Sequence, residues 1–191
     1  MKNNRKIILV TDGDKKALKA VELAAKNIGG RCISRSAGNP TELTGNEIVE
    51  LIKIAKYDPV VIMVDDRGDP GFGKGEAALK EVIEHSDIDV LGVVAVASNT
   101  ENVMGIEVDF SIDCKGEIVY GGVDKNGIKT ENNKVYGDTV DIINDYHFPY
   151  IVGVGDVGKM DGKDDCKIGA PIITKALEEI MDRSSLYEKQ Q

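Results

Sequence analysis

Three short apolar runs, each breaking into a loop of glycines and acids, constrain the fold of this chain most strongly. The runs span residues 7–10, 60–64 and 151–155, and the acidic loops that follow contain Asp12, Asp65 and Asp156. Continuous apolar strands that alternate with amphipathic helices are typical of a parallel sheet covered on both faces. We therefore predict a three-layer α/β fold, Rossmann-like or Toprim-like, with a mostly parallel sheet. Loops at the carboxyl edge of such a sheet commonly bind ligands.

The spacing of apolar residues predicts the individual elements. Strands are expected at 6–10, 31–36, 60–64, 89–97 and 150–154, and helices through 18–28, 48–55 and 78–83 and from Pro171 onward, fraying after Arg183. Thr44 and Glu47 have the spacing of a capping box. Residues 108–113 and 117–120 predict a β-hairpin in the C-terminal half. Residues 123–137 predict a loop or a ragged second hairpin, followed by a short helix through Val140, Ile142 and Ile143.

Length and composition favour a soluble, single-domain protein. The chain has 191 residues, of which 41% are hydrophobic and 30% charged, so we expect one α/β domain over 1–185 and a polar tail over 186–191. No apolar run approaches the roughly 20 residues of a membrane span, and run 7–10 is too short for a signal peptide. We therefore expect an intracellular protein. Its net charge of −9 disfavours nucleic-acid partners.

Five carboxylates follow two of the predicted strands. Asp12 and Asp14 follow the first, and Asp65, Asp66 and Asp69 follow the third. If these strands are neighbours, the carboxylates converge, and oxygen ligands suit Mg²⁺, Mn²⁺ or Ca²⁺ rather than zinc. The alternative is that Asp12 and Asp14 cap a helix while Asp66 and Asp69 shape turns.

The arrangement of these acids is similar to that of the Toprim fold of primases, topoisomerases and nucleases. That resemblance implies Mg²⁺-dependent phosphoryl chemistry. This chain departs from the pattern because its first acid is Asp12 rather than a glutamate, and because its second motif has the spacing Asp65-Asp66-x-x-Asp69. A shared fold is weak support for a shared function.

A second candidate ligand-binding segment follows the last strand. Its residues are Gly153, Gly155, Asp156, Gly158 and Lys159, which fit G-x-x-x-x-G-K, but methionine replaces the usual serine or threonine at the next position. A glycine turn that lets the backbone approach a neighbouring loop or an anion is favoured over a nucleotide-binding loop. The lysine is also placed to neutralise the acidic cluster. We identify no serine, cysteine or histidine arrangement for catalysis, and so assign no catalytic residues.

Strings of residues along nearly the whole chain resemble the stage V sporulation protein AE family, the soluble member of the SpoVA set of endospore-forming bacteria. These strings are residues 10–14, 29–34, 38–41, 91–98, 155–160, 163–165 and 169–172. The resemblance implies a role in sporulation and germination beside SpoVA membrane proteins that move calcium dipicolinate. It also implies a position peripheral to the spore inner membrane, and it assigns no catalytic residues.

Three hypotheses follow from the sequence. The first is a non-enzymatic accessory of the SpoVA assembly, with the hairpin region 108–120 as a candidate contact surface. The second is a divalent-metal-dependent phosphoryl-transfer enzyme that uses the acidic loops, with Mg²⁺ or Mn²⁺ as cofactor. The third is a sensor whose acidic edge binds Ca²⁺, alone or with dipicolinate. Whether the chain forms a homodimer is left open.

Overall fold

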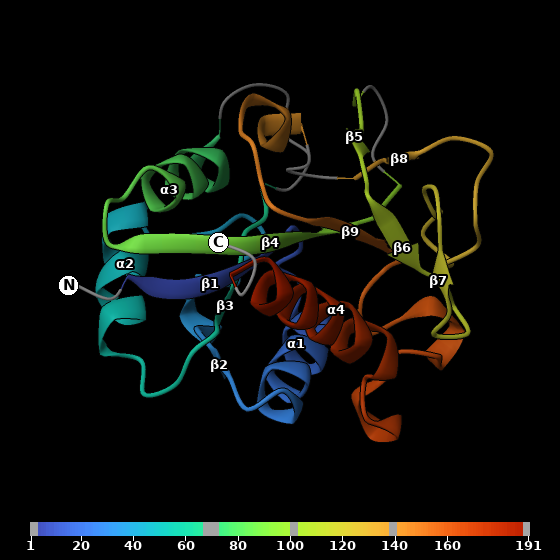
Figure 1. The fold of residues 1–191 in the computed structure, drawn as a ribbon, viewed down its shortest axis with the longest axis horizontal. Helices are drawn as coiled ribbons and strands as arrows, with labels where there is room; N and C mark the ends of the chain where they lie inside the picture. Colours follow the sequence, from blue (N-terminus) through green and yellow to red (C-terminus); the bar gives the residue numbers. More distant parts are fainter. Residues whose placement is uncertain (1–3, 67–72, 100–102, 138–140, 189–191) are drawn as a thin grey trace.

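The computed structural model describes residues 4–66, 73–99, 103–137 and 141–188 and has the predicted α/β architecture (Figure 1). A seven-stranded sheet has the order β2-β3-β1-β4-β9-β6-β7. All neighbouring strands are parallel except β6 and β7, which are antiparallel. The strands are β1 (Arg5–Val10), β2 (Arg31–Cys32), β3 (Val60–Met63), β4 (Ile88–Val96), β6 (Phe110–Ile112), β7 (Ile118–Val119) and β9 (Ile151–Val154). A separate antiparallel pair joins β5 (Ile106–Glu107) to β8 (Lys134–Val135).

Four α-helices cover the two faces of the sheet. They are α1 (Lys15–Asn27), α2 (Gly45–Ile54), α3 (Lys74–Ile83) and α4 (Pro171–Glu188). Helices α1 and α4 pack together on one face, and α2 and α3 pack together on the other. Figure 1 shows α3 above the sheet and α1 and α4 below it. Four 3₁₀-helices complete the described chain: η1 (Ser34–Ser36), η2 (Asp141–Asp145), η3 (Met160–Gly162) and η4 (Cys166–Ile168).

The continuous apolar strands reflect burial on both faces. In β1, Ile7 and Leu9 lie in the core under α2 and α3, while Ile8 and Val10 lie in the core under α1 and α4. Successive side chains of a strand point to opposite faces, so a strand with helices on both sides requires apolar residues at every position. The three-layer prediction is therefore confirmed.

The predicted capping box of α2 is confirmed. The hydroxyl of Thr44 accepts a hydrogen bond from the backbone N–H of Glu47, and the Glu47 carboxylate accepts one from the N–H of Thr44. The reciprocal bonds satisfy two backbone donors that a helix start leaves free. Helix α1 ends before Gly29, whose φ of 75° is readily adopted by glycine.

The predicted strand over 31–36 is wrong after Cys32. Strand β2 ends at Cys32, and the chain then turns into η1. The buried hydroxyl of Ser36 donates to the carbonyl of Ile33 at 2.7 Å and accepts the N–H of Met63 at 2.9 Å. The serine side chain thus takes a bond that a longer strand would make with β3, which is how serine competes with regular structure.

The hairpin prediction is confirmed, because β6 and β7 pair through Ser111 with Val119 and Ile112 with Ile118. Strand β6 also pairs in parallel with β9, so the hairpin extends the main sheet. In the region 123–137, β8 pairs with β5 and Val123 bridges Lys129. The predicted short helix is the 3₁₀-helix η2, and Val140 lies outside the described residues.

The end of the chain differs from the predicted fraying after Arg183. Helix α4 continues to Glu188. Ser184 is buried and its hydroxyl donates to the carbonyl of Leu91 at 3.2 Å, so the C-terminal turns of α4 are tied to β4. The division of the chain after residue 185 into a domain and a polar tail stays a prediction.

Candidate functional site

The strand order creates a switch point between β1 and β4. The chain passes from β1 to β2 and β3 on one side of β1, and then crosses to β4 on its other side. Ligands of open α/β sheets commonly bind outside the carboxyl ends of strands at such a point. Thr11 fixes this end of β1, because its hydroxyl accepts the N–H of Val96 at 2.9 Å. The loops after β1 and β9 therefore lie on either side of the end of β4.

Three carboxylates from these two loops meet. Asp12, Asp14 and Asp156 each place one carboxylate oxygen within 4.8 Å of the others. Asp12 and Asp14 follow β1, and Asp156 follows β9. The structure thus brings together two residues predicted as metal ligands and one predicted for the glycine-rich segment. We call Asp12, Asp14, Asp156 and Lys159 the acidic cluster.

Lys159 joins the carboxylates of the acidic cluster. Its ammonium group donates to Asp14 Oδ2 at 2.5 Å and to Asp156 Oδ1 at 2.9 Å. Asp14 is also the N-cap of α1, since its Oδ1 accepts the N–H groups of Lys16 and Ala17 at 2.7 and 3.0 Å. Both predicted roles of this residue are therefore compatible: one oxygen caps the helix and the other faces the cluster.

Asp12 has the most unusual electrostatic environment of the cluster. Burial raises its pKa to about 7, and the negative charges of Asp14 and Asp65 act in the same direction. The N–H of Asp14, which donates to Asp12 Oδ1 at 3.0 Å, and the charge of Lys159 oppose this rise. A carboxyl group with this pKa gains or loses its proton near neutral pH.

The Asp14–Lys159 pair is held in its charged form. Burial alone would raise the pKa of Asp14, but the hydrogen bonds from Lys159 and Ala17 outweigh it and lower that pKa. Burial alone would lower the pKa of Lys159, but its bonds to Asp14 and Asp156 raise it. The ammonium group therefore supplies the positive charge that a cluster of carboxylates requires.

Asp65 lies beside the cluster, facing the loop that follows η1. Its side chain is 4% exposed, and its Oδ2 accepts a hydrogen bond from the Asn39 amide at 2.8 Å. Its backbone N–H donates to the hydroxyl of Thr41 at 3.0 Å, and its carbonyl accepts the N–H of Thr41 at 2.8 Å. Asp65 acts on Asp12 through its charge, while its hydrogen bonds fix the end of β3.

Asp66 turns away from the cluster toward α3. Its side chain is 4% exposed, and its Oδ1 accepts the N–H of Gly75 in the first turn of α3 at 3.1 Å. No described residue bonds its buried Oδ2. The structure therefore separates Asp66 from Asp12 and Asp14, with which the sequence grouped it. Asp69 lies outside the described residues.

The glycines of the second segment serve close packing. A Cβ atom at Gly153 would lie 2.3 Å from Ser111 Oγ, and one at Gly155 would lie 2.6 Å from the backbone N of Gly127. Gly158 has a φ of 73° and approaches the carbonyl of Lys16, from which a Cβ would be 2.7 Å away. The close approach of Gly158 to α1 is what brings Lys159 to Asp14.

Asp164 is a buried residue that sequence reasoning did not single out. Its Oδ2 accepts the N–H of Gly158 at 3.2 Å, and its Oδ1 accepts the N–H groups of Ile172 and Ile173 at 2.8 and 3.1 Å. Burial raises its pKa, although these three bonds oppose the rise. It joins the start of α4 to the loop that carries Lys159. The sequence holds no signal for this role, because Asp164 lies seven residues before Pro171.

The acidic cluster has the size of a cation site. Ca²⁺ binds oxygen ligands at about 2.3–2.6 Å, so three oxygens within 4.8 Å of one another fit around one ion. Such an ion would compete with the Lys159 ammonium for the carboxylates of Asp14 and Asp156. The arrangement can therefore act as an internal ion-pair network or exchange its lysine for a divalent cation.

Comparison with known proteins gives one match. The family model described as stage V sporulation protein AE1 matches residues 6–184. The comparisons with curated proteins and with solved structures give none. In the described part of the chain, no helix combines the length and apolar character needed to span a membrane.

Proposed function

The chain belongs to the stage V sporulation protein AE1 family, which gives it a role in sporulation, and from this premise we propose that it is a non-enzymatic accessory of the SpoVA assembly. In this role it would act beside the SpoVA membrane proteins, peripheral to the spore inner membrane, in the movement of calcium dipicolinate. The observation that carries the proposal is the extent of the family match, which covers residues 6–184 of 191.

The acidic cluster supports an accessory role better than a catalytic one. A phosphoryl-transfer site of the predicted kind needs the carboxylates after β1 and β3 at one metal ion. Asp66 instead binds the first turn of α3, and the carboxylate of Asp65 is bonded by Asn39. The carboxylate that meets Asp12 and Asp14 within 4.8 Å is that of Asp156, and Lys159 already pairs with Asp14 and Asp156.

Deletion of the gene in an endospore-forming host tests the accessory role. We expect spores with less dipicolinate, or spores that release dipicolinate more slowly after a germinant is added, and we expect the wild-type gene to restore both. Normal dipicolinate content together with normal release would contradict the proposal. Spore counts and heat resistance should be recorded on the same cultures, so that a general defect in sporulation is recognised.

A second candidate function is a Ca²⁺ or calcium dipicolinate sensor, favoured by the grouping of Asp12, Asp14 and Asp156. Titration calorimetry with Ca²⁺, Mg²⁺ and Mn²⁺, each with and without dipicolinate, tests it. We expect saturable heat that Asp156→Asn abolishes and Asp161→Asn preserves, because Asp161 is an exposed acid of the same loop outside the cluster. Absence of saturable heat under every condition would leave the cluster as an internal ion-pair network.

A further inference from the structure

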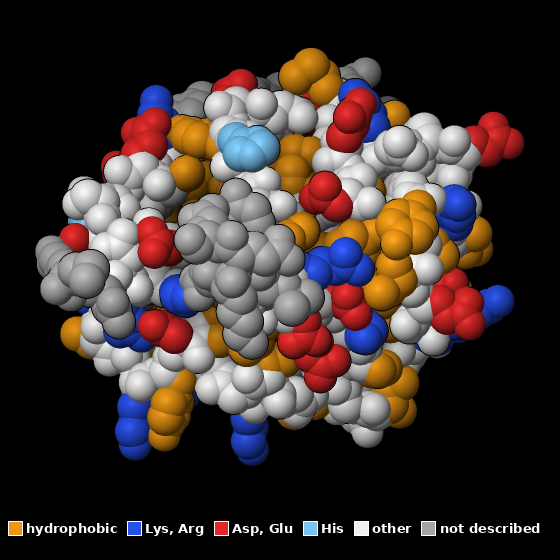
Figure 2. All heavy atoms as spheres, viewed as in Figure 1, with side chains coloured by type: hydrophobic (Ala, Val, Ile, Leu, Met, Phe, Trp, Pro, Cys, Tyr) orange, Lys and Arg blue, Asp and Glu red, His pale blue; other side chains and the backbone are white. Residues whose placement is uncertain are grey.

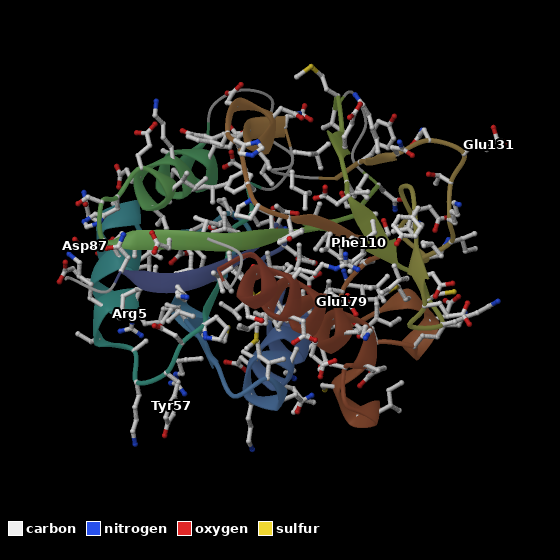
Figure 3. The ribbon with its side chains drawn as sticks, in the orientation of Figure 1. Arg5, Tyr57, Asp87, Phe110, Glu131 and Glu179 are labelled. Carbon is white, nitrogen blue, oxygen red and sulfur yellow. The ribbon has the colours of Figure 1, made fainter. Side chains whose placement is uncertain are left out.

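A second apolar face of α2 is directed to solvent. Ile48, Val49 and Ile52 face the core, whereas Leu51 is half-buried and Ile54 is 78% exposed. Residues three apart lie on the same side of a helix, so Leu51 and Ile54 form a separate stripe. Tyr57 continues it beyond the helix and is 52% exposed. Figure 3 shows Tyr57 pointing away from the body, and Figure 2 shows basic and hydrophobic side chains projecting together from the same lower left side.

Two hollows flank this stripe and share Leu51 and Ile54 as walls. The first, of about 490 Å³, reaches Leu43 and Arg35. The second, of about 420 Å³, reaches Ile33 and Tyr57. Because the hollows share two side chains, they form one continuous surface along α2 beside the β2 edge of the sheet. We call this surface, with its walls and rim, the α2 groove.

The rim of the α2 groove carries three exposed cations. Arg31, Arg35 and Lys56 are exposed, and none has an ion pair within the described part of the chain. The Lys56 ammonium lies 5.3 Å from the centre of the Tyr57 ring. The charge of Arg35 acts on Glu47 of the same hollow. Three exposed cations beside an apolar surface stand out in a chain whose net charge is −9.

The two carboxylates that line the groove already have partners. Glu47 accepts hydrogen bonds from the N–H and hydroxyl of Thr44 in the capping box. Glu50 pairs with Lys53 at 3.2 Å. The groove therefore presents apolar walls to whatever covers it, with three cations and these two bonded carboxylates along its rim.

We infer that the α2 groove binds an acidic amphipathic helix of a different protein. A helix that docks in a groove inserts bulky apolar side chains spaced three or four residues apart. The two adjoining hollows accept such side chains in succession, and acidic residues beside them pair with Arg31, Arg35 and Lys56. Complementary charge of this kind raises the association rate and fixes the orientation of the helix.

Other occupants fit the groove less well. A second copy docked about a two-fold axis would set a patch with three cations against the same patch, in which Glu47 and Glu50 are already bonded within their own chain. A bilayer surface would leave the two hollows unfilled. An added β-strand would find only Arg31–Cys32 to pair with, and very short edge strands protect a sheet from such additions.

The inference deepens the accessory role proposed above, because it names the surface and the chemistry of the partner. It does not require that the partner be a SpoVA protein. If the groove binds an acidic helix of a protein unrelated to SpoVA, the inference holds and the proposed function is contradicted. If a SpoVA protein binds at another surface, the proposed function holds and the inference is contradicted.

Photo-cross-linking of the full chain in sporulating cells tests the inference. Benzoylphenylalanine is introduced at Ile54 and, as a matched control, at Ile128, which is 57% exposed and lies outside the groove. We expect an adduct at position 54 with one other protein, whose cross-linked peptide is acidic and has apolar residues at helical spacing. An adduct with a second copy, with lipid or with a neutral or basic segment would overturn the inference, as would no adduct.

Charge reversal tests how much the rim cations contribute to partner binding, independently of the apolar walls. With the probe kept at position 54, the triple change Arg31→Glu, Arg35→Glu and Lys56→Glu should lower adduct yield by about tenfold, since three rim pairs are lost. The control triple Lys15→Glu, Lys19→Glu and Lys26→Glu alters net charge equally on α1 and should leave the yield unchanged. Equal yields from both triples would contradict a charge-matched partner. Circular dichroism of both purified variants confirms that the fold is kept.

Discussion

The ammonium group of Lys159 lies 2.5 Å from Asp14 Oδ2, which joins the loop after β9 to the N-cap of α1. The two residues are 145 positions apart in the chain. The contact places a positive charge among Asp12, Asp14 and Asp156, where a metal ion would otherwise be expected. Whether this position holds lysine alone or exchanges it for a cation is the central question about the site.

Replacement of Lys159 should destabilise the fold and favour cation binding. Lys159→Met removes two ion pairs and leaves the carboxylates of Asp14 and Asp156 without their cation. Because the lysine side chain is 36% exposed, solvent screens these pairs, and we expect a loss of about 1 kcal/mol in urea unfolding. Addition of Ca²⁺ should restore part of this loss. The control is Lys163→Met, because Lys163 lies in the same loop and its ammonium group donates to Cys114 Sγ at 3.5 Å rather than to a carboxylate of the cluster; an equal loss there would argue against a specific role.

Asp12 should make stability depend on pH. Its pKa rises from 3.8 in the unfolded chain to about 7 in the fold, so the native state holds a proton that the unfolded state has lost between these values. The unfolding free energy should therefore fall as pH rises from about 4 to about 7, by at most about 4 kcal/mol. Asp12→Asn should remove this contribution, because the amide does not titrate.

The measurement for Asp12 is urea unfolding of wild type and Asp12→Asn across that pH range. The variant should gain stability relative to wild type as pH rises, and the difference should level off above about pH 7. Parallel stability curves for the two proteins would show that Asp12 does not titrate in the fold in this way.

Loss of the Asp164 carboxylate should be strongly destabilising. Asp164→Ala leaves the N–H groups of Gly158, Ile172 and Ile173 without their acceptor in a buried position. Each unsatisfied buried donor costs about 1–3 kcal/mol, so a loss of about 3 kcal/mol or more is expected in denaturant unfolding. Its neighbour Asp165 caps only the short helix η4 through the N–H of Lys167. Asp165→Ala should cost about 1 kcal/mol, and a similar loss from both changes would contradict the assigned role.

Gly158 should tolerate no side chain. Its φ of 73° disfavours alanine, and a Cβ would lie 2.7 Å from the carbonyl of Lys16. Gly162 has a φ of 82° but no atom within 4 Å of the Cβ position. Its replacement by alanine therefore measures the cost of the positive φ alone, without a steric clash. We expect Gly162→Ala to cost about 1 kcal/mol and Gly158→Ala to cost more. Thermal unfolding of both variants checks this order, and equal midpoints would show that the approach to α1 is not required.

The sequence by itself determined the elements that local physics controls. The apolar runs predicted β1, β3, β4 and β9, because strands buried on both faces need apolar residues throughout. Thr44 and Glu47 predicted the start of α2, since a capping box depends on residues three positions apart. The prediction that β2 continues to residue 36 failed. The buried hydroxyl of Ser36 accepts the N–H of Met63 in β3, and Met63 is too distant in the sequence for a local pattern to reveal this bond.

Only the tertiary structure decided which carboxylates meet. The sequence grouped Asp12 and Asp14 with Asp65 and Asp66. Strand β3 does lie beside β1, but Asp65 bonds Asn39 and Asp66 bonds the start of α3, whereas the loop after β9 reaches past the end of β4 and brings Asp156 to the cluster. Strand order depends on packing between segments far apart in the chain, and spacing along the sequence does not encode it. The direction of a single side chain is also settled by its neighbours, as Asp66 shows by bonding the start of α3.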